Sequence, residues 1–182
     1  MNKLKEKYHK EVAKMFQEKY GVKNVMAVPR ITKVILNAGI GRFLKEKEAA
    51  DEIIAAFKGI TGQKPVLAKA KKSISGFKIR QGQEIGVTVT LRGRRMWDFL
   101  ERLVHVSFPR VRDFRGIEEK YFDSQGNLNM AIREHIVFPE ITAENVRNIF
   151  GLQVAVVNTA RTKEQGIELF KLLGFPIKSH NA

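Results

Sequence analysis

The sequence predicts an α+β fold: an antiparallel sheet with helices packed on one face and a basic opposite face. One observation is the strict alternation of apolar and polar residues over 84–92, which indicates a strand with one buried and one wet face. Another is that strand and helix patterns mix through short connections, with no repeat or linker between them. A third is the net charge of +14, from 33 Lys and Arg against 19 Asp and Glu. We expect one domain over residues 1–182, with a loop protruding at about 72–82.

Helical and strand patterns follow one another in the first third of the chain. Apolar residues recur at helical spacing from about residue 2 to 20, and Gly21 is placed to end this helix. Residues 30–38 alternate with a period of two, which predicts a strand. A second helix is expected from about 46 to 60.

The middle of the chain predicts a strand hairpin followed by a helix. A strand should begin near Val66, with Val66, Ala68 and Ala70 on one face and Leu67, Lys69 and Lys71 on the other. The strand over 84–92 follows the loop. A helix is then expected over 93–106, ended by Pro109.

The last third predicts two strands and two helices. Residues 109–125 show no regular pattern, and Leu128–Ile132 suggests a strand. Thr142 is placed to cap a short helix through about Phe150, and 153–159 reads as a strand. Thr162 and Gln165 form a capping-box pattern that opens a helix ending near Leu173.

The stretch from Lys64 to Arg95 is strongly basic. It contains nine Lys or Arg and a single acid, Glu84, and hydroxyl and amide residues that suit phosphate and sugar contacts lie between them. Such an excess of positive charge, with almost no acidic residues, predicts an extended polyanion as the partner. RNA is favoured over DNA because no helix-turn-helix, zinc finger or basic zipper is present. The predicted basic face of the sheet would carry Lys33, Asn37, Lys69, Lys71, Thr88, Thr90 and Arg92.

Other chemistries have weaker support. Gly39 and Gly41 form half of a dinucleotide-binding fingerprint, and a turn that needs positive φ or close backbone approach is the stronger interpretation. Gly59 and Gly62 match the GxxG of the KH module, although a helix C-cap is favoured. A nucleotide-dependent enzyme and a chromosome-binding protein therefore stay open as alternatives.

The sequence contains no pattern typical of a metal site, a reactive thiol or a membrane-spanning segment. There are no cysteines, and the four histidines are scattered without a metal-type spacing. The longest apolar run has five residues, whereas a membrane helix needs about twenty. We expect no metal, no cofactor and no membrane partner.

Three long blocks of the sequence resemble one known family. They read ITGQKPVLAKAKKSISGFKIRQG, VTLRGRRMWDFLERLVHVSFPRVRDFRG and REHIVFPEI. They are similar to the bacterial family of large-subunit ribosomal protein L-five, and the resemblance runs nearly end to end. It implies a non-catalytic, cytoplasmic protein of the ribosome that binds 5S rRNA and attaches it to the central protuberance. It also implies neighbouring large-subunit rRNA and proteins, the P-site tRNA, and small-subunit ribosomal protein thirteen across an intersubunit bridge.

The resemblance also implies roles for particular residues. The rRNA-binding residues that it implies are Asn37, Gln63, Lys64, Lys71, Thr88, Thr90 and Arg92. The basic face predicted from alternation adds Lys33 and Lys69 to the expected rRNA-binding residues. The expected tRNA-contacting loop contains Lys72, Ser73, Ser75, Gly76, Phe77, Lys78 and Arg80. The expected bridge residues are Arg110, Arg112, Asp113, Phe114 and Arg115.

Overall fold

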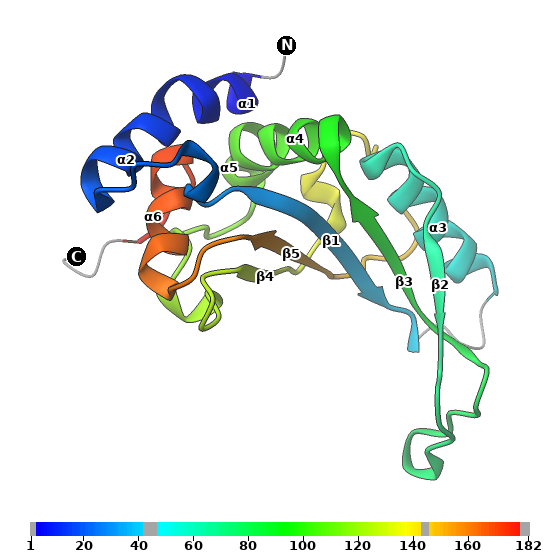
Figure 1. Cartoon of the computed structure of the whole chain (residues 1–182). Coiled ribbons are helices and arrows are strands. Elements are labelled where there is room, and N and C mark those ends of the chain that lie inside the picture. The colour runs from blue at the N-terminus through cyan, green and yellow to red at the C-terminus, as the bar shows by residue number, and fades with distance from the viewer. Residues whose placement is uncertain (1–2, 42–46, 143–145, 179–182) are drawn as a thin grey trace. The chain divides into compact units, whose positions relative to one another are not determined.

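A computed structural model of the chain describes residues 3–41, 47–142 and 146–178 (Figure 1). Its centre is a five-stranded sheet in the order β2-β3-β1-β5-β4, which confirms the predicted α+β class with an antiparallel sheet. The strands are β1 (Ile31–Gly39), β2 (Val66–Lys69), β3 (Glu84–Leu91), β4 (Leu128–Ile132) and β5 (Leu152–Asn158).

The chain divides into two compact units. The first unit comprises Met1–Val34, Leu91–Met130 and Ala155–Ala182, and the second comprises Ile35–Thr90 and Ala131–Val154. The expectation of a single domain stays a prediction.

The N-terminal helix of the first unit confirms the pattern over 2–20. It consists of α1 (Lys3–Lys7), a π-helical turn over Tyr8–Val12, and α2 (Ala13–Tyr20). Gly21 ends it in the left-handed conformation with φ 64°, and its N–H donates to the carbonyl of Gln17. Phe16 is buried on the inner face, packed with Ala13 and Val28.

The next helix of the first unit runs further than its sequence predicts. It consists of α4 (Gly93–Arg102), a π-helical turn over Leu103–Ser107, and α5 (Phe108–Arg110). Pro109 was expected to end it near 106, and this expectation is wrong. The N–H of Phe108 reaches back to Leu103 O, and this widened turn carries the chain past the proline, which has no N–H to donate.

The C-terminal helix of the first unit, α6 (Lys163–Leu173), begins at the predicted cap. Thr162 Oγ1 accepts a hydrogen bond from Gln165 N at 3.3 Å, and Gly174 ends the helix with φ 95°. The loop before β4 packs directly on this helix. A Cβ built on Gly126 would lie 2.7 Å from Gly166 Cα, so both positions require glycine.

The second unit builds its core from one helix and the sheet. Helix α3 (Lys47–Thr61) confirms the pattern over 46–60 for the described residues, and Ile53, Phe57 and Ile60 are fully buried. Val87 and Val89 bury the predicted face of β3. Strand β2 pairs antiparallel with β3, with a register shift between Ala68 and Lys69.

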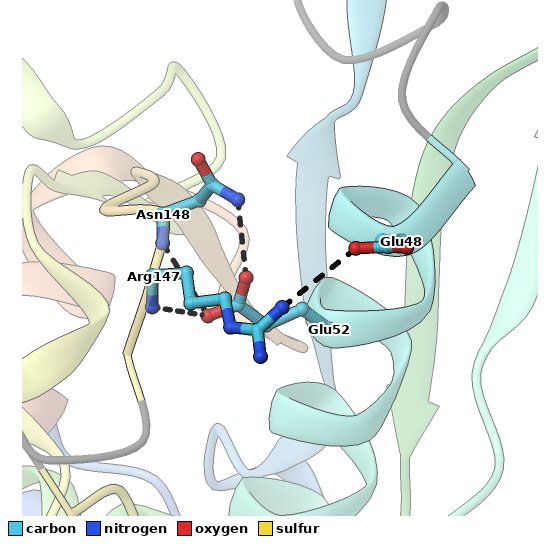
Figure 2. Close-up of polar contacts among 4 residues, drawn as sticks. All are labelled: Glu48, Glu52, Arg147 and Asn148. Atoms are coloured by element: carbon cyan, nitrogen blue, oxygen red, sulfur yellow. Dashed lines mark hydrogen bonds and ion pairs between the residues drawn. The ribbon is translucent and has the colours of Figure 1, made fainter.

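The segment before β5 differs from its prediction. A short helix was expected from Thr142 to Phe150; residues 143–145 lie outside the described residues, and 146–150 are not helical. Instead, the Glu52 carboxylate on α3 accepts hydrogen bonds from Arg147 N at 2.8 Å and from Asn148 Nδ2 at 3.1 Å (Figure 2). One helix side chain thus replaces the hydrogen bonds that a helical turn would have supplied.

Candidate RNA interface

A row of polar side chains lies on β1 and β3 within the second unit. Thr88 Oγ1 donates to Leu36 O on the neighbouring strand at 3.1 Å, and Gln63 Nε2 donates to Thr90 O at 3.3 Å. Asn37 is exposed, and its Oδ1 lies 3.8 Å from a Cβ built on Gly86. The structure therefore brings Asn37, Gln63, Thr88 and Thr90 together.

The hydrogen bonds of Thr88 and Gln63 determine what this row can offer to a partner. A hydroxyl has one proton, and Thr88 directs it to a backbone carbonyl, so its oxygen is left as an acceptor. Gln63 keeps a carbonyl oxygen and one amide N–H, because only Nε2 makes a bond to Thr90. Such a row can match groups on a sugar edge or a base edge.

The turn that carries Gln63 is fixed by a buried threonine. Thr61, the last residue of α3, is 5% exposed, and its Oγ1 donates to Phe57 O at 2.6 Å. The same oxygen accepts from Gln63 N at 3.2 Å. Gly62 has φ 63° and donates to Lys58 O, so the helix C-cap interpretation of the GxxG pattern is confirmed.

Three exposed lysines follow Gln63 along the turn and the neighbouring strand β2. No ion pair joins Lys64, Lys69 or Lys71 to a described acidic side chain. The register shift lies in β3. One step along β2, from Ala68 to Lys69, matches two steps along β3, from Gly86 to Glu84, so the extra residue belongs to β3. The alternation of β2 continues through the shift. Because Val66 pairs with Thr88, Lys69 takes the phase of Leu67, and the register does not give the predicted shared face of Lys69 and Thr88.

The loop after β2 is an ordered hairpin with a closed tip. Ile74 and Ile79 exchange both backbone hydrogen bonds, at 2.9 and 3.1 Å, around a 3₁₀ turn over Ser75–Phe77. Gln81 N donates to Ser73 Oγ at 2.9 Å. Lys78 adopts the left-handed conformation with φ 54°. The predicted loop residues therefore have fixed backbone positions, and their side chains are exposed: Lys72, Ser73, Ser75, Gly76, Phe77, Lys78 and Arg80.

The predicted bridge segment lies in the first unit, after α5. Phe114 stacks on Phe108 with ring centroids 5.0 Å apart, which anchors the segment to the core. Asp113 has φ 55° and Gly116 has φ 96°, so the backbone turns sharply there. Four predicted residues project from this anchored turn with exposed side chains: Arg110, Arg112, Asp113 and Arg115.

Two predicted rRNA residues belong to the first unit. Lys33 is half-buried on β1, and it alternates in phase with Asn37 along that strand. Arg92 lies just beyond β3, as the exposed N-cap residue of α4. The predicted strand thus ends one residue earlier than expected.

Sequence reasoning missed three features of this surface. No sequence pattern pointed to the role of Thr61, because the hydrogen bonds of its hydroxyl depend on where α3 ends. Val66 is 64% exposed, although apolar residues at alternate positions are expected to face the core. The register offers the reason, since Val66 pairs with Thr88 on the polar row. Phe77, 75% exposed, was assigned to the loop, but its outward display by a closed tip could not be foreseen.

The glycine turn after β1 does not have the properties expected of it. Neither Gly39 nor Gly41 has a positive φ, and a Cβ at either position would meet nothing within 4 Å. The expectation of a strained or closely approached turn is therefore wrong. Among the described residues, no group of three His, Asp or Glu side chains could hold a metal ion. No helix in the described ranges is long and apolar enough to cross a membrane.

Comparisons with known proteins cover nearly the whole chain. The family model described as "Ribosomal protein L5" matches residues 24–80, and the model for the C-terminus of the same ribosomal family matches residues 84–177. A Halothermothrix orenii protein named "Large ribosomal subunit protein uL5" is 47% identical over 176 residues, 97% of this chain and 98% of its own length. Proteins of the same name from Carboxydothermus hydrogenoformans and Symbiobacterium thermophilum are 47% and 49% identical over the same shares.

Proposed function

Because the chain belongs to the ribosomal protein L5 family, we propose that its second unit binds 5S rRNA and attaches it to the central protuberance. The family makes the chain a structural, non-enzymatic constituent of the large ribosomal subunit, and bacterial ribosomes lie in the cytoplasm. The partners that follow from membership of this family are rRNA and ribosomal proteins.

The observation that carries the proposal is the polar row together with three exposed lysines of the adjoining turn and of β2 and its end, none of which forms an ion pair with a described acidic side chain. Lys64, Lys69 and Lys71 supply attraction to phosphates, which is strong and independent of sequence. Thr88 and Gln63 supply acceptors and an amide donor in positions fixed by hydrogen bonds to backbone carbonyls, and Asn37 adds an exposed amide. Charge would thus give affinity, and the fixed polar groups would give register on a folded RNA.

Salt dependence and competition test the 5S rRNA proposal. Binding of 5S rRNA should weaken steeply as salt rises, because each neutralised phosphate releases counterions. An unrelated folded RNA of equal length should bind more weakly, and duplex DNA should not displace 5S rRNA. Equal affinity for all three would contradict specific recognition and favour a general polyanion binder.

We assign the hairpin 72–81 to the P-site tRNA and separate its tip, Ser75–Lys78, from 5S rRNA binding, to which the lysines at its base contribute. Charge reversal at Lys71 and Lys72 should weaken 5S rRNA binding, whereas changes over Ser75–Lys78 should spare it and alter tRNA positioning. Lys10→Glu with Lys14→Glu, two exposed lysines of the first unit, is the matched charge control. Equal loss of 5S rRNA binding in both hairpin variants would refute the division.

We assign the anchored turn 110–115 to small-subunit ribosomal protein thirteen in the intersubunit bridge. The support is its projection of Arg110, Arg112 and Arg115 from a stacked anchor at Phe114. Replacing the three arginines by glutamine should weaken association of the two subunits while 5S rRNA binding stays unchanged. Unaltered subunit association, measured by sedimentation, would remove this assignment.

A further inference from the structure

A second acid-free basic region lies mostly outside the surface described above. From Lys19 to Lys45 the sequence contains six Lys or Arg and no Asp or Glu. Another acid-free run extends from Asn145 to Lys163. The proposed 5S rRNA surface draws on only a few residues of the first run and none of the second, so most of this charge has no assigned role.

The fold joins these two runs within the first unit. Thr159 N donates to Arg30 O at 3.0 Å, and Arg30 N donates to Thr159 Oγ1 at 3.0 Å. Arg161 follows two residues later, which keeps its Cα within about 7 Å of that of Thr159. Arg30, Thr159 and Arg161 are all exposed, and no described acidic side chain forms an ion pair with either arginine. Residues 129 positions apart thus form one basic patch.

The turn before Arg30 displays two apolar side chains beside this patch. Met26 is 84% exposed and Val25 is 58% exposed. The turn is held in place, because Asn24 Oδ1 accepts from Met26 N at 2.9 Å and Val28 is buried at 2%. Tyr8 Oη also donates to Pro29 O at 3.1 Å. The outward display is therefore part of a fixed conformation.

We propose that Lys23, Val25, Met26, Arg30, Thr159 and Arg161 form a second RNA-binding surface, which takes the backbone of a double-helical rRNA segment. The arginines and Lys23 contact phosphates, and Met26 and Val25 lie against the sugars of the shallow minor groove. A protein partner fits less well. Interfaces with nucleic acid are much more positively charged than those between proteins, and this patch carries three cations and no acid.

The absence of cysteine from the chain allows a short-range test. Met26→Cys carries a benzophenone photocrosslinker, and the labelled full-length protein is assembled into large subunits. The expected result is a crosslink from position 26 to rRNA. Met15→Cys is the matched control, since Met15 is a 51% exposed methionine of the same unit outside the patch. It should give no RNA crosslink.

The alternative outcomes separate this inference from the proposed function. A crosslink from position 26 to a ribosomal protein, or none at all in assembled subunits, overturns the second surface. Lys69→Cys, labelled in the same way, reports on the proposed 5S rRNA site independently. When Arg30→Gln and Arg161→Gln are both introduced, the yield of the crosslink from position 26 should fall several-fold, and that of the crosslink from position 69 should persist. An unchanged yield from position 26 overturns the role of the two arginines.

Discussion

A single hydroxyl, that of Thr61, connects the core of the second unit to its polar row. We predict that Thr61→Val, which keeps the shape and removes the hydroxyl, lets the Gln63 turn shift and lowers 5S rRNA affinity by up to about tenfold, equivalent to about 1.4 kcal/mol. The salt dependence should stay unchanged, because no lysine is lost. Filter binding over a salt series measures both.

Two companion variants separate positioning from mere stability. Thr61→Ser keeps the hydroxyl and should restore binding. Thr61→Val combined with Gln63→Ala should bind no worse than Gln63→Ala alone, because both changes act through the same side chain. Additive losses of affinity in the double variant would show that Thr61 acts through another residue than Gln63. If Gln63→Ala alone leaves the 5S rRNA affinity unchanged, the proposed 5S rRNA site itself is in question.

His135 gives the second unit a defined response to acid. Its ring is 1% exposed and stacks on Phe150 with centroids 3.9 Å apart. Burial lowers the pKa of His135 below its ordinary 6.5, and this outweighs the opposing effects of the Phe150 hydrogen bond and the Glu52 charge. The unfolded chain therefore takes up a proton at a pH where the folded chain does not. The stability due to the neutral ring is full above about pH 6.5 and falls as the pH drops toward the lower folded pKa.

We predict that His135→Asn flattens this dependence. The asparagine amide oxygen can accept from Phe150 N, as His135 Nδ1 does at 3.4 Å, but it does not titrate. Urea unfolding between about pH 7 and pH 5 should show a smaller loss of unfolding free energy in the variant. An identical pH slope in both proteins would exclude His135 as the source. Asp123 remains in both proteins, so its lowered pKa cancels in the comparison. The pKa of Glu52 stays lowered by its hydrogen bonds to Arg147 and Asn148 and loses only the smaller effect of the His135 charge.

At the scale of elements, the contact between the loop before β4 and α6 tolerates no side chain. A Cβ on Gly166 would lie 2.5 Å from Gly126 Cα, and both partners are backbone that cannot move aside. We predict that Gly166→Ala lowers the free energy of unfolding by about 1–3 kcal/mol through overpacking. Gly126→Ala should cost at least as much, because Gly126 also has φ 76°.

Gly59 provides the matched control for these glycine substitutions. It lies inside α3, and a Cβ there would meet nothing within 4 Å. Gly59→Ala should therefore raise the free energy of unfolding by up to about 1 kcal/mol, because alanine favours the helix. If Gly166→Ala and Gly59→Ala shift the denaturation midpoint in the same direction, the close contact is not a determinant of stability.

The elements with strong periodicity could be predicted from the sequence. Alternation over 84–92 gave β3, and the pattern of Thr162 and Gln165 gave the start of α6. The failures occur where distant partners replace local signals. Pro109 is passed by a π-helical turn, and the segment 146–150 takes its hydrogen bonds from Glu52, nearly 100 residues earlier.

The candidate site shows the same limits. Composition and the resemblance could predict the basic stretch and its residues, whose roles stay predictions. They could not predict that Val66, rather than Lys69, shares the side of Thr88, since the register depends on both strands. Nor could they predict that Arg30 lies beside Thr159, because the pairing of distant strands has no local signal.

At the scale of the whole molecule, the net charge of +14 opposes the compact state. We predict that the melting temperature of the free protein rises with sodium chloride, as the Debye length falls from about 10 Å at 0.1 M to about 3 Å at 1 M. Calorimetry in chloride, rather than in sulfate or phosphate, avoids the general stabilising action of excluded anions. A melting temperature that falls over this range would show that internal ion pairs outweigh repulsion.

The position of β1 has a consequence for synthesis of the chain. It is the first strand to be made, yet it lies in the middle of the sheet, between β3 and β5. β3 ends at Leu91 and β5 begins at Leu152, so 61 positions separate the arrival of its two neighbours. At about 5–20 residues per second this leaves one edge of β1 without its native partner for roughly 3–12 s. During that interval the nascent chain presents an open strand edge, and this period is when chaperone binding or mispairing would compete with correct folding.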